Sequence, residues 1–276
     1  MSRKIPTAIL RVATASILAY SLMLGYLYAA QESLIFVGTK LPADHEFDFD
    51  LPYRELTINV DGAALNALHF RQPDPRGLVF FLHGNGGNLR SWATGADYYQ
   101  RVNYDMFMLD YRGYGKSTGA IASEEQLHAD VRAAWDTIAP EYAGKPIVLY
   151  GRSLGAALAV RLATDVEPDL VVLVSPFRSM LAMASAQYPI VPTALVRYPL
   201  RSDEFIAKVR APIVFVHGDR DTFIPIDHSL ELRELASAPT RLLTIEGADH
   251  YDIHSYSSYL EGLADVLPDG GKAPGQ

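Results

Sequence analysis

Hydrophobic positions in this chain fall into one long apolar run near the N-terminus and a series of short apolar segments further on. Among these short segments, residues 77–84 are almost wholly apolar, which is typical of a strand buried on both faces of a parallel sheet. Helical patterns separate them, and this alternation predicts a mostly parallel sheet covered on both sides. The predicted strands are residues 77–84, 106–113, 146–151, 170–175, 212–218 and 241–247.

Helices are expected between these strands, and Ser123 followed by Gln126 is a capping box that opens one of them. Ahead of the parallel strands, residues 56–60 and 64–70 are expected to pair as an antiparallel hairpin, because the Asp61-Gly62 dipeptide between them favours a tight turn. We expect residues 33–54, between the N-terminal apolar run and this hairpin, to form an irregular lead-in segment. The helices are expected over residues 88–102, 123–138, 154–164, 227–236 and 251–267. This order of elements predicts one α/β domain.

The connection over residues 176–211 is longer than the others, and we expect short helices in it. It holds apolar and proline residues, among them Phe177, Met180, Tyr188 and Pro189. A connection of this length is usually functional or covers a site. We therefore interpret it as a cap segment; simple packing against the sheet is the alternative.

The long apolar run, Val12 to Ala30, has the length and composition of a membrane-spanning helix. Its nineteen uncharged residues would reach about 28 Å, close to the hydrocarbon thickness of a bilayer. Arg3 and Lys4 precede the run, so the positive-inside rule predicts a single-pass anchor with a cytoplasmic N-terminus and the domain on the other side, which is the periplasm in a bacterium. The alternatives are a cleaved signal peptide, whose cleavage site after Ala30 would be poor, and a buried helix.

Three regions are therefore expected: residues 1–30 as cytoplasmic N-terminus and anchor, residues 31–268 as the α/β domain, and residues 269–276 as a flexible tail. The chain has a net charge of −8, and beyond residue 30 it carries 21 basic and 32 acidic residues, a net of −11. Phosphate backbones would repel so acidic a domain, so no nucleic-acid partner is expected. The absence of cysteine excludes a thiol nucleophile, disulfides and thiolate metal sites.

A candidate nucleophile, Ser153, lies in Gly151-Arg152-Ser153-Leu154-Gly155, between a predicted strand and a predicted helix. This G-x-S-x-G pattern in a strand–turn–helix context is typical of a serine that projects from a sharp, strained turn, where flanking glycines leave room for neighbouring backbone. The alternative is a tight turn in which Ser153 only caps the helix.

An oxyanion hole needs two N–H donors aimed at the developing charge. We expect the backbone N–H of Leu154 to be one donor. The backbone N–H of Asn85 is expected to be the other, in the glycine-rich loop after the strand 77–84; Gly84 and Gly86 are alternatives in the same loop. That loop could also be an ordinary turn.

The predicted base is His250, which follows the last predicted strand and so lies at the same sheet edge as the serine; His254 is the alternative. The predicted acid is Asp221, after the strand 212–218, with Asp219 as its competitor. The order Ser, Asp, His along the chain matches that of Ser-His-Asp hydrolases built on α/β sheets. His83 and His217 are interpreted as buried or loop-bracing residues.

These motifs resemble the α/β-hydrolase superfamily. The resemblance is closest to its membrane-anchored branch of bud-emergence-type and abhydrolase-domain-containing proteins, related to serine-aminopeptidase-like domains. It covers about residues 31–265 and implies that the second aspartate of HGDRD, Asp221, is the triad acid. The segments that carry it are LHGNGGN (82–88), DYRGYGKSTG (110–119), YGRSLG (150–155), SPFRSM (175–180), HGDRDTFIP (217–225) and GADH (247–250).

The sequence therefore predicts an α/β-hydrolase fold and a serine hydrolase that cleaves carboxylic esters or thioesters through an acyl-enzyme, without a metal or organic cofactor. Its expected partners are a small-molecule or lipid-like acyl substrate and the membrane. A serine peptidase or amidase is the alternative, although we find no charged cluster suited to a peptide terminus. A non-catalytic binding protein is less expected, because all three triad residues are present in order. The superfamily hosts many chemistries, so the fold does not select among them.

Overall fold

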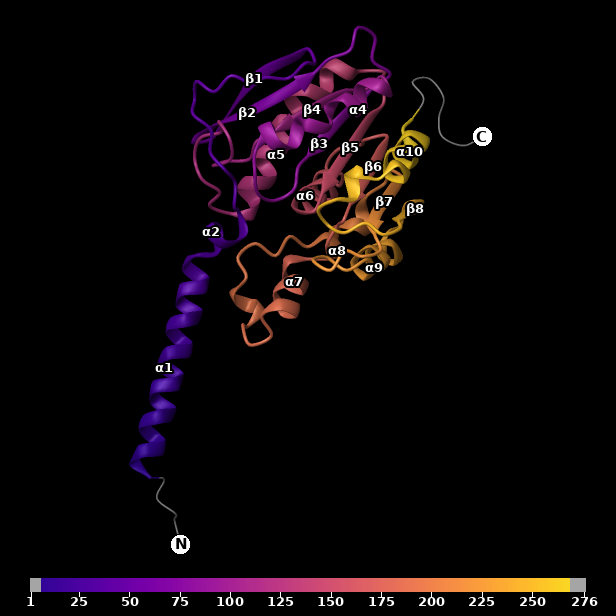
Figure 1. Ribbon diagram of the computed structural model, residues 1–276. Coiled ribbons are helices and arrows are strands. Elements are labelled where there is room, and N and C mark those ends of the chain that lie inside the picture. Colours follow the sequence, from indigo (N-terminus) through magenta and orange to yellow (C-terminus); the bar gives the residue numbers. More distant parts are fainter. Residues whose placement is uncertain (1–5, 269–276) are drawn as a thin grey trace.

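The computed structural model describes residues 6–268 and contains one eight-stranded sheet in the order β1-β2-β4-β3-β5-β6-β7-β8 (Figure 1). The hairpin β1–β2 is antiparallel and pairs antiparallel with β4, and the strands from β4 to β8 run parallel. The carboxyl ends of these parallel strands therefore share one edge. The strands are β1 (Tyr53–Val60), β2 (Ala63–Phe70), β3 (Leu78–Leu82), β4 (Asp105–Leu109), β5 (Ile147–Arg152), β6 (Leu170–Val174), β7 (Ile213–Gly218) and β8 (Thr240–Ile245).

Each parallel strand contributes side chains to two hydrophobic cores, one on each face of the sheet. Phe80 belongs to the core beneath α5 (Glu124–Ile138), α6 (Leu154–Leu162) and α9 (Asp227–Leu235). Its neighbour Phe81 belongs to the opposite core, beneath α3 (Leu89–Trp92), α4 (Ala96–Arg101) and α10 (Ser257–Val266). Because side chains alternate between faces and both faces are covered, the strands β3 to β7 are apolar at most positions, whereas only one residue of the edge strand β8 is buried.

Two predicted helices are shorter than expected. The helix predicted over 88–102 is split into α3, a 3₁₀ turn over Ala93–Gly95, and α4; the glycine of that turn is a poor helix former. The helix predicted over 251–267 begins only at Ser257, after a 3₁₀ turn over Ile253–Ser255. The lead-in contains a short helix, α2 (Gln31–Ile35), in place of a wholly irregular start.

The N-terminal helix α1 (Thr7–Ala29) projects from the α/β body, and none of its residues is buried (Figure 1). Its length and composition suffice to cross a membrane, with a mean hydropathy of 1.6 over its most apolar window. The side of the membrane on which each end lies stays a prediction. Arg3, Lys4 and the predicted tail 269–276 lie outside the described residues.

The connection between β6 and β7 projects from the body on the same side as α1 (Figure 1). It contains α7 (Met180–Gln187) and α8 (Ser202–Phe205), with 3₁₀ turns over Thr193–Leu195 and Ile206–Lys208. We refer to residues 176–211 as the cap segment.

We predict that Gly155→Ala destabilises the protein, because a Cβ at this position would lie 2.0 Å from the carbonyl oxygen of Leu82. Overpacking against a strand should lower the free energy of unfolding by about 1–3 kcal/mol. The matched control is Gly95→Ala, where a Cβ would meet nothing within 4 Å. Urea unfolding of both variants tests this, and equal stability of the two would contradict the close packing of α6 on β3.

Candidate active site

Ser153 occupies the single residue between β5 and α6, in a strained backbone conformation with φ of 51° and ψ of −114°. Positive φ in a non-glycine residue costs about 1–3 kcal/mol and is concentrated at functional sites. The glycines on either side have no space for a side chain, since a Cβ on Gly151 would lie 2.3 Å from the carbonyl oxygen of Gly155. The G-x-S-x-G pattern is therefore explained by packing, and the turn holds Ser153 at the carboxyl edge of the sheet.

Leu154 is the first residue of α6, which is nine residues long. N–H groups in the first turn of a helix have no acceptor within the helix, and this end carries the positive pole of the helix dipole. The backbone N–H of Leu154 is thus a suitable donor for negative charge that develops beside Ser153.

Both polar atoms of the Asn85 side chain are engaged in hydrogen bonds with neighbouring residues. Its Oδ1 accepts from the Tyr114 hydroxyl at 2.7 Å and from the Val37 N–H at 3.2 Å. Its Nδ2 donates to the carbonyl of Ile35, the last residue of α2. Asn85 lines the same cavity as Ser153. The side chain therefore fixes the loop, which leaves the backbone N–H as the group available for an oxyanion.

A buried carboxylate, Asp110, braces this loop and was not identified in the sequence. Its Oδ1 accepts from the Leu89 N–H at 3.0 Å and lies 3.6 Å from Nε2 of His83. Burial raises the pKa of Asp110, in opposition to its contacts with His83 and Leu89. His83 is itself fully buried and donates from Nδ1 to the Gly84 carbonyl at 2.7 Å, which confirms its bracing role. An aspartate directly after a buried strand was the available signal.

Asp221 and His250 come together at the same sheet edge, from the loops after β7 and β8. Nδ1 of His250 donates to Oδ2 of Asp221 at 2.8 Å, and both side chains are buried. The backbone carbonyl of His250 accepts from Nη2 of Arg152 at 2.9 Å. Arg152 immediately precedes Ser153, so this bond fastens the histidine loop to the serine turn.

The Asp221 carboxylate is held in its ionised form. Burial opposes ionisation, but hydrogen bonds from His217, His250 and the Ile224 N–H outweigh it and hold the pKa of Asp221 well below its usual value. The Phe223 and Ile224 N–H groups donate to Oδ1 at 3.1 and 2.7 Å. Fully buried His217 lies behind this carboxylate, with Nε2 at 3.4 Å from Oδ2.

Asp219, the alternative acid, and His254, the alternative base, interact with other residues. Oδ1 of Asp219 accepts from the Gly247 N–H at 2.7 Å, which braces the histidine loop from an exposed position. His254 lies in a 3₁₀ turn, with Nδ1 at 3.3 Å from Nη1 of Arg152. Burial, together with the charge of Arg152, lowers the pKa of His254.

Ser153, Leu154 and Asn85 line a cavity of about 370 Å³. The rest of its wall comes from α1, α2, the cap segment and the loop after β7, and none of the lining residues is charged. These residues are Leu27, Tyr28, Gln31, Leu34, Ile35, Phe177, Met180, Met183, Ala184, Gln187, Tyr188, Val191, Leu195, Val196, Phe223 and Ile224.

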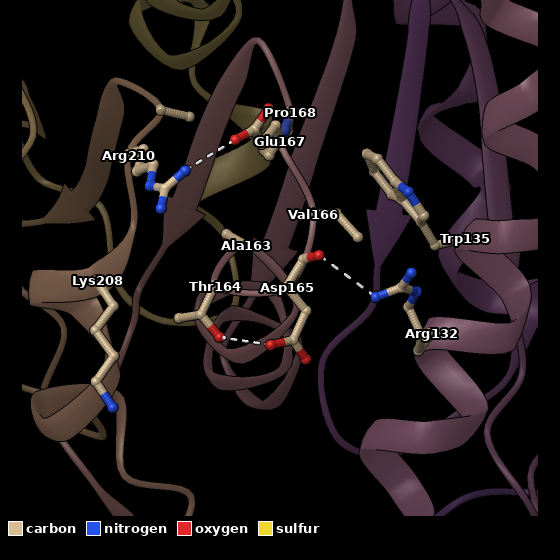
Figure 2. A pocket seen from close by; sticks show the side chains of 11 residues that line it. Arg132, Trp135, Ala163, Thr164, Asp165, Val166, Glu167, Pro168, Lys208 and Arg210 are labelled. Carbon is tan, nitrogen blue, oxygen red and sulfur yellow. Dashed lines mark hydrogen bonds and ion pairs between the residues drawn. The ribbon is translucent and has the colours of Figure 1, made fainter.

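A second cavity, of about 740 Å³, lies at the opposite edge of the sheet, among residues that precede β6 and β7 (Figure 2). Its charged side chains are engaged with one another or with nearby residues; Arg210 pairs with Glu167 at 3.1 Å and Arg132 with Asp136 at 2.8 Å. Because these charged groups already have partners, we do not take this cavity as the candidate active site, although its volume exceeds that of the cavity beside Ser153. Within residues 6–268, no group of three His, Asp or Glu side chains is arranged to hold a metal ion.

Several known proteins are similar to this chain in sequence. The family model "Serine aminopeptidase, S33" matches residues 73–198. Alpha/beta hydrolase domain-containing protein 17C of Xenopus tropicalis is 36% identical over 212 residues, which is 75% of this chain. The human protein 17B is 33% identical over 196 residues, or 69% of this chain. The chain belongs to the α/β-hydrolase superfamily. Within it, these relatives place the chain in the abhydrolase-domain-containing branch, and the alignments span 66% of the length of each.

Solved structures of the superfamily share the fold. An esterase of Pyrococcus furiosus aligns with a TM-score of 0.67 at 19% identity, covering 83% of this chain and 96% of its own. Est1E of Butyrivibrio proteoclasticus, solved with ferulic acid, aligns with a TM-score of 0.60 at 20% identity and covers 76% of this chain and 95% of its own.

We predict that Asp221→Asn lowers the hydrolytic turnover number by about ten-thousand-fold, because an amide would favour the wrong imidazole tautomer. Asp219→Asn, in the neighbouring exposed position, is the matched control and should retain most of the activity. Steady-state kinetics on one ester substrate compares the two variants. A large loss for Asp219→Asn with activity retained in Asp221→Asn would reverse the assignment of the acid.

Proposed function

We propose that the protein is a serine hydrolase that cleaves carboxylic esters or thioesters of apolar acyl substrates. The observation that carries the proposal is the buried Asp221–His250 hydrogen bond, at the same sheet edge as the strained Ser153 turn. Membership of the superfamily and the fold shared with esterases support hydrolysis as the reaction class.

In the proposed mechanism, ionised Asp221 accepts a hydrogen bond from the Nδ1–H group of His250. This bond fixes the tautomer in which Nε2 is unprotonated and can take the hydroxyl proton of Ser153. The serine oxygen attacks the acyl carbon, and the N–H groups of Leu154 and Asn85 stabilise the resulting oxyanion. His250 then gives the proton to the leaving alcohol or thiol, and an acyl-enzyme forms. Water, activated by His250, attacks that ester and releases the carboxylic acid.

The walls of the cavity favour an acyl chain over a peptide. Side chains such as Phe177, Met180 and Met183 present an apolar surface beside Ser153, which suits a hydrocarbon chain. An aminopeptidase must bind the α-ammonium group of its substrate, and no carboxylate lines the cavity. We therefore propose ester or thioester hydrolysis in preference to peptide hydrolysis, with the catalytic domain held on the non-cytoplasmic side by α1.

We predict that a fluorophosphonate probe labels the wild-type protein but not Ser153→Ala, because the probe reacts with a serine whose proton is removed by an adjacent base. Ser175→Ala is a matched control: this buried serine follows the neighbouring strand β6 and has a similar φ of 45°. In-gel fluorescence and mass spectrometry identify the labelled residue. Undiminished labelling of Ser153→Ala would place the nucleophile elsewhere.

A further inference from the structure

The cap segment is attached to α1 along the second half of that helix. The Tyr20 hydroxyl, in the middle of α1, donates to the Ile190 carbonyl at 2.6 Å. Beyond the end of α1, Nε2 of Gln31 donates to the Leu195 carbonyl at 2.7 Å, and its Oε1 accepts from the Arg197 N–H at 2.8 Å. We refer to residues 188–192 as the cap loop.

These contacts fix the depth of the cap loop when α1 crosses a bilayer. The 23 residues of α1 extend about 35 Å, against a hydrocarbon thickness of about 30 Å. Tyr20 lies nine residues, or about 14 Å, before Ala29. Even if the whole excess length emerged on the side of the catalytic domain, Tyr20 and its partner Ile190 would lie about 9 Å below the hydrocarbon boundary.

The side chains of the cap suit this depth. No charged residue occurs from Ser179 to Val196. Tyr188 and Ile190 are 57% and 65% exposed to the surroundings of the protein. In water this apolar surface would be unfavourable, whereas in a bilayer it is matched by lipid chains.

The backbone of the cap loop also suits an apolar medium, in which an unpaired polar group is costly. Pro189 and Pro192 carry no N–H. The N–H of Tyr188 donates to the Ala184 carbonyl at 2.8 Å, and that of Val191 to the Tyr188 carbonyl at 2.9 Å. Of the five residues, Ile190 alone contributes a further N–H donor, and its carbonyl already accepts from Tyr20.

The first charged residue after this uncharged stretch is Arg197, which lies beside the end of α1. Arg197 pairs with Glu32 at 2.6 Å, and its guanidinium lies 5.5 Å from the centroid of the Tyr28 ring. Tyrosine and arginine side chains are favoured at the boundary between hydrocarbon and headgroups. This cluster therefore marks the level of the headgroups, with the cap loop on one side of it and the sheet on the other.

We propose that the cap loop is a second membrane-embedded element, docked on the anchor, and that the acyl chain of a bilayer amphiphile enters the active-site cavity directly from the lipid. The end of α1, with Leu27 and Tyr28, and the cap, with Tyr188 and Val191, both line that cavity, and so does Ser153. The choice of substrate rests on the proposed hydrolase function, whereas insertion of the cap loop does not.

Fluorescence tests the insertion directly, because the natural chain has no cysteine. The full-length Ile190→Cys variant, labelled with an environment-sensitive fluorophore, is reconstituted in phosphatidylcholine vesicles with and without spin-labelled lipid. Exposed Thr137, on α5, supplies the control variant Thr137→Cys. We expect blue-shifted emission and quenching by spin-labelled lipid at position 190 only.

Aqueous emission at position 190, unquenched by lipid, would overturn the proposal. A blue shift that lipid does not quench, and that disappears when the protein is diluted among more vesicles, would also overturn it. That result would mean that a second copy of the chain, and not lipid, covers the loop.

Kinetics test the route of the substrate with Ile190→Asp, a change outside the cavity lining. A charge at this depth should expel the loop and lower hydrolysis of a long-chain fluorogenic ester embedded in vesicles by about tenfold or more, with p-nitrophenyl acetate hydrolysis unchanged. Unchanged rates on both substrates, or equal losses on both, would contradict lateral entry. If the wild type hydrolyses neither substrate, the proposed function fails, and the fluorescence result still decides whether the loop inserts.

Discussion

The close packing of α6 against β3 and β5 is the constraint on which the rest of the site depends. Gly151 and Gly155 permit this approach, which forces Ser153 into a positive φ and directs the first turn of α6 to the carboxyl edge of the sheet. Since β3, β7 and β8 run parallel to β5, the loops that follow them reach the same edge. A local steric requirement thereby brings four distant segments of the chain together.

Polar contacts then fix these loops relative to one another. The Asp221 carboxylate is satisfied by backbone N–H groups and two histidines, so it remains ionised despite burial. Arg152 links the serine turn to the carbonyl of His250. Asn85 links the predicted oxyanion loop to α2, which follows the anchor directly. The N-terminal helix, the cap and the candidate active site are therefore parts of one connected structure, as the proposed entry of an acyl chain from the bilayer requires.

Much of this arrangement could be predicted from the sequence because its signals are local. Short apolar-rich segments that alternate with helical patterns indicated the parallel strands, Asp61-Gly62 indicated the hairpin turn, and G-x-S-x-G indicated the strand–helix junction. The interruption of the helix predicted over 88–102 was not expected from the apolar periodicity, although Gly95, a poor helix former, lies in the turn that separates α3 from α4. The position of Asp110 directly after a strand could be read from the sequence. Its partner His83, like the contact of Tyr20 with Ile190, lies far away along the chain, and no periodicity encodes such pairs.

The central claim is that the Ser153 hydroxyl, activated by His250 and Asp221, attacks a substrate carbonyl carbon. The backbone N–H groups of Leu154 and Asn85 lie beside that carbon. A crystal structure of the protein inhibited by an alkyl phosphonate tests it most directly. The account predicts phosphorus bonded to Oγ of Ser153, a phosphoryl oxygen that accepts from the N–H groups of Leu154 and Asn85, and the alkyl chain between α1 and the cap. An adduct on another residue, or a phosphoryl oxygen directed away from both N–H groups, would contradict it.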